Sequence, residues 1–188
     1  MSYLHGRKWR WARWIGVFLI ISGFAIITFR YQNNVVLKPY YDTTDQDYIV
    51  KSLQKDMFWI SDNPDFDIER MLKERNPSQY TTSHAGKLQV KMLYDKNRRA
   101  GMVAYYRKNF YEGRIFILWV DPTFRGKGYG EFLLQYAINQ LFKEGCTKVT
   151  LVTRLINTWA RKVYTSVGMH ETSHDAIFIN FAINKKEK

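Results

Sequence analysis

Alternation of hydrophobic and polar positions predicts β-strands in the first half of the chain. Hydrophobic side chains occupy every second position from Leu88 to Tyr94, a period typical of a strand with one buried face. A polar turn at residues 95–98 separates this segment from an apolar one at residues 101–106. The two segments are therefore expected to pair as a hairpin. A short β-branched run at residues 35–37 predicts one further strand.

Helical spacing lies between the first predicted strand and the hairpin. Apolar side chains recur at this spacing from Tyr48 to Met57, and the polar residues 42–45 can cap the start of a helix. Residues 65–75 predict a second, shorter helix that stops before Pro77. The first part of the domain is therefore expected to contain both strands and helices.

The second half of the chain predicts alternating strands and helices. The uninterrupted apolar run at residues 115–120 (IFILWV) is typical of a central strand that is buried on both faces. A helix with an apolar stripe is expected from Gly130 to Glu144. A strand at residues 149–152, a helix at residues 158–166 and a strand at residues 177–183 follow. The order of elements predicts an α/β (α+β) fold.

An uncharged apolar segment precedes the domain, at residues 14–29. As a helix it would span roughly 24 Å, and the tryptophans beside it suit a membrane interface. The sequence is therefore divided into an N-terminal region with a transmembrane helix, residues 1–32, and a domain at residues 33–188. Cleavage as a signal peptide after small residues is the alternative. A helix buried in the domain core is disfavoured because every face is apolar.

Charge and cysteine content narrow the class of protein. The net charge is +12, and the first 30 residues hold five basic and no acidic side chains, which leaves 24 basic and 17 acidic residues in the remainder. A basic surface attracts phosphates, nucleic acid or anionic lipid. Cys146 is the single cysteine of the chain, so an intrachain disulfide is excluded and a small buried residue is expected there.

A glycine-rich loop joins the predicted central strand to the following helix. It reads Arg125-Gly126-Lys127-Gly128-Tyr129-Gly130. Glycine lets backbone amides approach a ligand, and a helix N-terminus adds unpaired amides and partial positive charge. The loop is therefore predicted to hold a diphosphate, with two cationic side chains at its mouth. It lacks the Gly-Lys-Ser/Thr end of a Walker loop and the spacing of a dinucleotide loop.

The segment LWVDPTFRGKGYGEFLL resembles motif A of the GNAT superfamily of N-acetyltransferases. A second motif of that family appears about 30 residues later, as Asn157, Ala160, Tyr164 and Gly168. The resemblance covers roughly residues 33–183. It implies a mixed, mostly antiparallel central sheet with flanking helices, and acetyl-CoA as co-substrate.

The resemblance also implies roles for individual residues. Backbone groups of Leu118 to Val120 would contact the acyl-pantetheine arm, and the Val120 amide would donate to the thioester carbonyl. Tyr164 would be the general acid that protonates the departing thiolate. The expected cofactor-binding set is Leu118, Trp119, Val120, Arg125, Gly126, Lys127, Gly128, Tyr129, Gly130, Glu131 and Asn157.

The chain departs from the family pattern at one catalytic position. Some relatives carry a glutamate as general base five residues before the motif's asparagine, where this chain has Val152. The proton of the attacking amine could pass instead to a water chain, to a backbone carbonyl, or to another acid such as Glu112 or Asp121. The general base is therefore left unassigned. The histidines lack metal-ligand spacing, so no metal is expected.

These features predict acetyl transfer to a primary amine by direct attack in a ternary complex. The acceptor, a small molecule or a protein, is not specified by the sequence, and self-association as a homodimer is left open. The alternative is a non-catalytic, membrane-tethered binding protein that uses its basic surface on anionic lipid or nucleic acid. For the enzyme, nucleic acid is not an expected partner.

Location is predicted from the N-terminal segment and from the need for a cytosolic thioester. The expectation is a single-pass membrane protein, bound to the lipid bilayer through residues 14–29, with its domain in the cytoplasm. The positive-inside rule favours the opposite orientation, because four basic residues precede the segment and only Arg30 and Lys38 follow closely. The chemical requirement is given priority over this bias.

Overall fold

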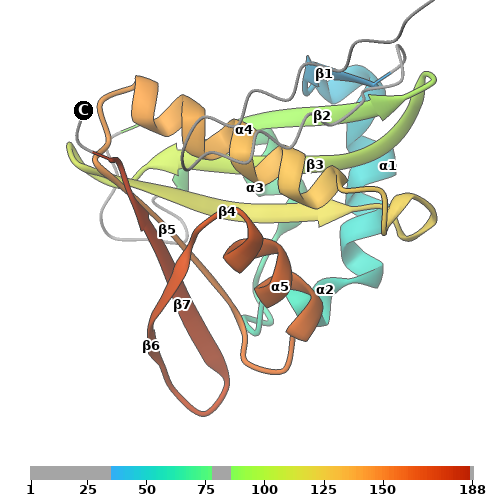
Figure 1. Cartoon of the computed structure of the whole chain (residues 1–188). Coiled ribbons are helices and arrows are strands. Elements are labelled where there is room, and N and C mark those ends of the chain that lie inside the picture. The colour runs from blue at the N-terminus through green and yellow to red at the C-terminus, as the bar shows by residue number, and fades with distance from the viewer. Residues whose placement is uncertain (1–34, 78–85, 187–188) are drawn as a thin grey trace, which may run out of the picture. The chain divides into compact units, whose positions relative to one another are not determined.

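A mixed β-sheet with helices on both faces forms the domain (Figure 1). The computed structural model describes residues 35–77 and 86–186. Within that part of the chain the sheet has seven strands in the order β1-β2-β3-β4-β5-β7-β6. Only β4 and β5 run parallel among these pairs. The strands are β1 Val35–Pro39, β2 Gln89–Asp95, β3 Arg98–Arg107, β4 Glu112–Val120, β5 Lys148–Arg154, β6 His170–His174 and β7 Phe178–Asn184.

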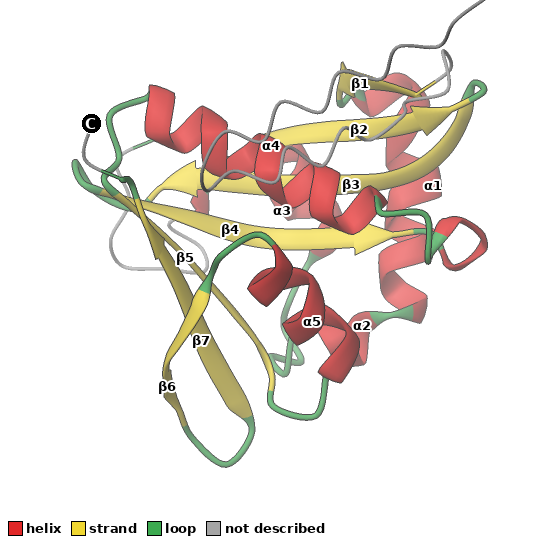
Figure 2. Ribbon diagram, viewed as in Figure 1, coloured by secondary structure: helices red, strands yellow, loops and turns green. Residues whose placement is uncertain are grey.

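Helices cover both faces of the sheet (Figure 2), and each face carries an apolar cluster. Helix α4, Tyr129–Lys143, covers one face with the apolar stripe expected from the sequence. Helices α1, Asp42–Lys55, and α3, Ile68–Glu74, cover the other face. Burying a large aliphatic side chain contributes about 1.5–3 kcal/mol, so these two clusters supply the main stabilisation.

A two-residue turn sets the register of the β2–β3 hairpin. Asp95 pairs with Arg98, and the residues between them, Lys96 and Asn97, have φ values of 49° and 64°. Positive φ at both positions is typical of a type I′ turn, whose twist matches that of the flanking strands. The hairpin predicted from the alternating pattern is therefore present.

A buried carboxylate fastens α1 to this hairpin. Asp45 is fully buried and accepts hydrogen bonds from the Tyr41 amide at 3.0 Å, from Arg99 Nε at 2.9 Å and from the Tyr94 hydroxyl. A buried charge is stable only when it is paired and hydrogen-bonded. These three donors meet that requirement, and they come from the helix start and from two strands.

Strands β4 and β5 pair over only three residues and then part. Glu112 to Arg114 pair with Lys148 to Thr150, whereas β4 continues to Val120. In the β3–β4 ladder Ala104 faces Ile117 and Tyr105 faces Ile115, so Phe116 is an extra residue and forms a β-bulge. The bulge and the parting leave the second half of β4 without a strand partner on its β5 side within the described residues.

The predicted elements are found with shifted ends, and three were missed: helix α2 (Met57–Ile60), the 3₁₀ helix η2 (Pro122–Phe124) and strand β6. The second predicted helix, residues 65–75, is shorter and is preceded by the one-turn helix α2. Strand β6 was not predicted, because its five residues are all exposed and carry no alternation. The central strand is not buried on both faces throughout: Ile115, Ile117 and Trp119 are buried, while the residues between them keep partial exposure beside the parted β5.

The predicted transmembrane segment, residues 14–29, lies outside the described residues. Within the part of the chain that the structure does describe, no helix has both the length and the apolar character needed to cross a bilayer.

Replacement of Asp45 by alanine tests the α1–hairpin link. Asp45→Ala leaves the Arg99 guanidinium without its buried partner, so we expect the free energy of unfolding to fall by about 3–5 kcal/mol. Urea denaturation measures it. The matched control, Asp47→Ala, removes an exposed carboxylate of the same helix and is expected to change stability by at most about 0.5 kcal/mol. A loss below about 1 kcal/mol for Asp45→Ala, set against these ranges, would contradict the assignment.

Candidate active site

Two unpaired backbone amides of β4 face the gap left by β5. The Asp121 amide donates to the Ala100 carbonyl of β3 at 3.0 Å. Backbone groups of successive strand residues point in opposite directions, so the amides of Leu118 and Val120 point away from β3. No described residue pairs with them on that side. They are therefore open to a ligand lying along the edge of β4.

Six consecutive amides are unpaired at the glycine loop. The Phe132 amide is the first to bond within α4, at 3.1 Å to the Gly128 carbonyl, and the amides from Gly126 to Glu131 have no partner among the described residues. Gly126 and Gly128 have φ values of 78° and 79°, a region that favours glycine. This concentration of donors at a helix N-terminus suits an anionic group.

The cationic side chains of the loop are held by carboxylates. Arg125 donates to the Val120 carbonyl through Nε at 3.0 Å and forms an ion pair with Asp56 at 2.9 Å. Lys127 lies 3.9 Å from the Asp95 carboxylate and 4.9 Å from the Phe124 ring centroid. Both side chains are about half exposed, so they can add positive potential beside the unpaired amides.

Two other predicted cofactor residues make well-defined protein contacts. The Tyr129 side chain is buried and its hydroxyl donates to Asp95 at 2.8 Å, so its backbone amide is the group left for a ligand. Trp119 pairs with Met102 in the ladder, and its indole donates to Asp56 at 2.8 Å. Asp56 thus joins the loop, β4 and the α1–α2 corner, a role that its sequence position does not indicate.

Helix α5, Thr158–Ser166, carries the two predicted residues of the second motif. The Asn157 side-chain oxygen accepts from the Ala160 amide at 3.1 Å and caps the helix. Its side-chain nitrogen has no partner among the described residues. Tyr164 is buried and packs edge-on against Phe181, with ring centroids 5.3 Å apart. Burial raises the pKa of Tyr164 to about 12, and a hydrogen bond with the Thr153 side chain opposes that shift only in part.

The loop, the open strand and α5 meet at Gly130. A Cβ atom added to Gly130 would lie 3.6 Å from Val163 of α5 and 3.9 Å from Val120 of β4. A hydrogen bond of 2.7 Å from Ser166 to Glu131 also links α5 to the start of α4. The structure therefore brings together segments that lie about 30 residues apart in the sequence.

Glu112 and Asp121, the two carboxylates considered as general base, both have a lowered pKa. Burial alone would raise the pKa of Glu112, but hydrogen bonds from Thr150 and Lys108 hold it below its usual value. Burial would likewise raise the pKa of Asp121, and hydrogen bonds from Thr123 and Tyr48 lower it. A base is most effective with a pKa near the working pH. Val152, the position of the missing glutamate, is 41% exposed.

A cavity of about 390 Å³ lies beside Val152. Its lining comes from α2 and from strands β3, β4, β5 and β7, and the polar part of that lining is Tyr106, Lys108, Arg114 and Asn180. Sequence reasoning did not single out these four residues, because they are widely separated and belong to no motif. No cluster of three metal-ligating side chains occurs among the described residues.

Comparisons with known proteins agree with this geometry. A sequence model of the acetyltransferase (GNAT) family matches residues 47–169. The [ribosomal protein bS18]-alanine N-acetyltransferase of Haemophilus ducreyi is 43% identical over 60 residues, which are 32% of this chain and 41% of that protein. The Escherichia coli K12 protein of the same name is 28% identical over 91 residues, 48% of this chain and 62% of that protein. The aligned segments thus span less than two thirds of these relatives.

Among solved structures, the fold is similar to spermidine N-acetyltransferase from Vibrio cholerae in complex with CoA and spermine. The TM-score is 0.64 with 16% sequence identity, over 80% of this chain and 95% of that chain. At this identity the likeness establishes the fold.

Substitution of Gly126 tests whether the loop binds a coenzyme. Gly126→Ala places a methyl group beside the unpaired amides and strains a residue with φ of 78°, so we expect the affinity for CoA to fall at least tenfold, a change of about 1.4 kcal/mol. Isothermal titration calorimetry measures it.

The matched control for this variant is Gly145→Ala. Gly145 also has positive φ, 96°, and open space around its Cβ position, but it follows the other end of α4. Both variants should lose about 1–2 kcal/mol of stability from backbone strain. Equal CoA affinity in the two variants would show that the loop does not hold the coenzyme.

Proposed function

Because the chain belongs to the acetyltransferase (GNAT) family, we propose that it is an acetyl-CoA-dependent N-acetyltransferase acting on a primary amine. The observation that carries the proposal is the open edge of β4 beside six unpaired amides of the glycine loop. The loop amides would bind the diphosphate of acetyl-CoA, and the pantetheine arm would lie in the gap between β4 and β5. The amine would attack the thioester directly, in a ternary complex.

Oxyanion stabilisation comes from the backbone of β4 in this proposal. When the amine nitrogen bonds to the thioester carbon, negative charge develops on the carbonyl oxygen. The amide of Val120, with that of Leu118 next on the same side, points into the gap where this oxygen would lie. Amides held rigidly by the β3–β4 ladder need no reorganisation during the reaction, which is the condition for effective stabilisation.

Tyr164 is proposed as the acid that protonates the departing thiolate. As the C–S bond breaks, the sulfur takes the electron pair and needs a proton. Since burial raises the pKa of Tyr164 to about 12, its hydroxyl keeps the proton throughout the physiological range. The proton lost by the amine passes to water, because Val152 replaces a carboxylate and the pKa values of Glu112 and Asp121 are lowered.

We propose that the acceptor binds in the cavity beside Val152. Several relatives are named for acetylation of a ribosomal protein alanine, and a similar structure is named for spermidine. An amine that enters from the cavity could reach the thioester from the side of the sheet that carries Tyr106 and Phe116.

Replacement of the tyrosine tests the chemical step. Tyr164→Phe keeps the ring packing on Phe181 and removes the proton donor, so we expect kcat to fall by about 10²–10⁴-fold. The affinity for CoA should stay unchanged. Release of CoA thiol across a panel of amines measures turnover, and calorimetry measures binding.

The pH profile adds a second criterion. Between pH 6 and pH 9 the rate of the unaltered protein should rise as the acceptor amine loses its proton, and the raised pKa of Tyr164 means that no fall from this group appears before about pH 12. Undiminished turnover in Tyr164→Phe would remove the tyrosine from the mechanism. CoA binding with no turnover of any amine would instead favour the non-catalytic alternative.

Membrane attachment through residues 14–29 is a separate proposal. Its support is the sequence: sixteen consecutive uncharged, mostly apolar residues flanked by tryptophan and arginine. We propose a single-pass protein whose domain, residues 33–188, lies in the cytoplasm, where acetyl-CoA is available.

Charged substitutions in the segment test the anchor. In the full chain, Leu19→Arg with Ile26→Arg should release the protein from carbonate-washed membranes, because each arginine at a helix centre costs about 2.5–3.5 kcal/mol. Retention in the membrane fraction after both changes would contradict a spanning helix. Protease treatment of intact cells distinguishes the two orientations, and digestion of the domain would contradict a cytoplasmic one.

A further inference from the structure

Arg114 lines the cavity with a positive charge, and the carboxylate of Glu112 acts on it electrostatically without forming an ion pair with it. It lies in the last paired position of β4, opposite Thr150 of β5. Its side chain donates one hydrogen bond, at 3.4 Å to the Thr150 hydroxyl, and it makes no ion pair with a described residue. Arg114 is partly buried, and this burial lowers the pKa of its guanidinium.

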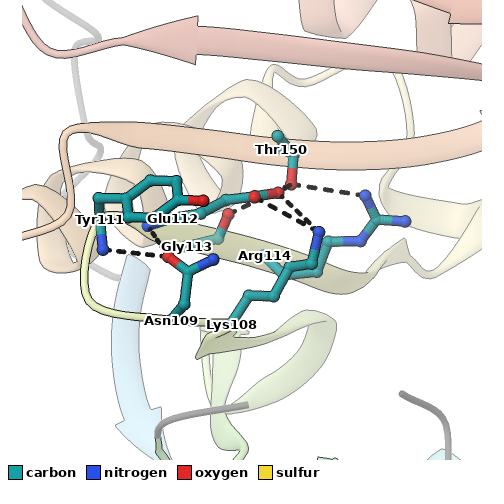
Figure 3. A network of polar contacts seen from close by, with 7 residues as sticks. All are labelled: Lys108, Asn109, Tyr111, Glu112, Gly113, Arg114 and Thr150. Atoms are coloured by element: carbon teal, nitrogen blue, oxygen red, sulfur yellow. Dashed lines mark hydrogen bonds and ion pairs between the residues drawn. The ribbon is translucent and has the colours of Figure 1, made fainter. Parts of the chain in front are cut away.

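The polar contacts around it are arranged so that no carboxylate reaches the guanidinium (Figure 3). The Thr150 hydroxyl stands between the two groups and donates to Glu112 at 2.7 Å. Glu112 is bonded in turn to Lys108, with both oxygens 3.3 Å from Nζ. Among the described residues, the lining of the cavity holds two cationic side chains, Lys108 and Arg114, and no carboxylate.

The Arg114 guanidinium has five N–H donors and uses one of them in a long hydrogen bond, so most of its hydrogen-bonding capacity is open to a ligand. Removing a charge from water is costly unless a counter-ion and hydrogen bonds replace the solvent. Planar carboxylate and phosphate groups match the guanidinium fork, so an oxyanion is the chemical group that completes it.

We infer that Arg114 receives an oxyanion of the acceptor, so that the substrate is an amine that also carries a carboxylate or a phosphate. The inference rests on the proposed function, because it assigns the cavity beside Val152 to the acceptor. It names the substrate class and makes Arg114 a specificity-determining residue. Tyr106 and Asn180 supply further polar groups in the same cavity.

The position of Arg114 along β4 limits the shape of this acceptor. Leu118, whose amide faces the gap, lies four positions farther along β4, which is at most roughly 13 Å between Cα atoms at about 3.3 Å per residue. This separation favours an acceptor whose amine and oxyanion lie several bonds apart over a single α-amino acid. An extended peptide N-terminus with an acidic side chain a few positions along it has the required length.

Paired peptides test the inference. Tetrapeptide amides that differ only in glutamate or glutamine at the third position are compared by kcat/KM and by calorimetric binding to the CoA-saturated protein. The unaltered protein should prefer the glutamate peptide by about 10- to 100-fold, the range for a hydrogen bond to a charged group. Peptides with phosphoserine or serine at the same position show which oxyanion is preferred.

Variants assign the preference to a residue. Arg114→Gln should reduce the ratio to near one, and Arg114→Lys should leave an intermediate ratio because it keeps the charge and loses the fork. Arg70→Gln removes an exposed arginine of α3 and should leave the ratio unchanged. If Arg114→Gln does not fold, as judged by thermal denaturation, the lysine variant decides.

Two outcomes would overturn the inference: a ratio near one in the unaltered protein, or the same ratio in Arg114→Gln. Calorimetry separates this result from failure of the proposed function. If no peptide is acetylated but the acidic peptides still bind more tightly through Arg114, the oxyanion site stands and the transferase activity does not.

Discussion

The parting of β4 and β5 is the constraint on which the rest of the site depends. In a sheet, most backbone amides form hydrogen bonds to a neighbouring strand. Here the pairing of β4 with β5 stops after Arg114. The β3–β4 ladder continues, so the open half of β4 stays rigid while the amides of Leu118 and Val120 remain available. The β-bulge at Phe116 lies at this transition, where bulges commonly re-aim side chains.

The glycine loop and helices α4 and α5 lie next to the open edge of β4. Gly130 lies where α4, α5 and Val120 meet, and a Cβ atom there would be in van der Waals contact with Val163. Asp56 accepts from both Trp119 and Arg125, so it connects the glycine loop to the helices that border the acceptor cavity. Asp56 thus links the glycine loop and β4 to the corner between α1 and α2.

Much of the fold and of the glycine loop could be predicted from short sequence patterns, because these features depend on residues close together in the chain. The alternating segments, the apolar stripe of α4 and the glycine loop each follow from backbone or packing rules within a few residues. Strand β6 gave no signal, since its five exposed residues share no buried face. Asp56 and Arg114 could not be assigned roles because their partners lie 63 and 36 residues away. Because strand residues alternate, the backbone of Trp119 faces β3, unlike that of Leu118 and Val120, and its place in the cofactor-binding set stays a prediction.

Amide hydrogen exchange followed by NMR, with and without CoA, tests the central claim most directly. The amides of Leu118, Val120 and residues 126–131 have no partner within residues 35–77 and 86–186, so they should exchange rapidly in the free protein and become protected when CoA is added. The amide of Trp119 faces β3 and serves as an internal reference that is protected in both states. If CoA leaves the exchange of the open amides unchanged, the coenzyme does not lie in the gap between β4 and β5.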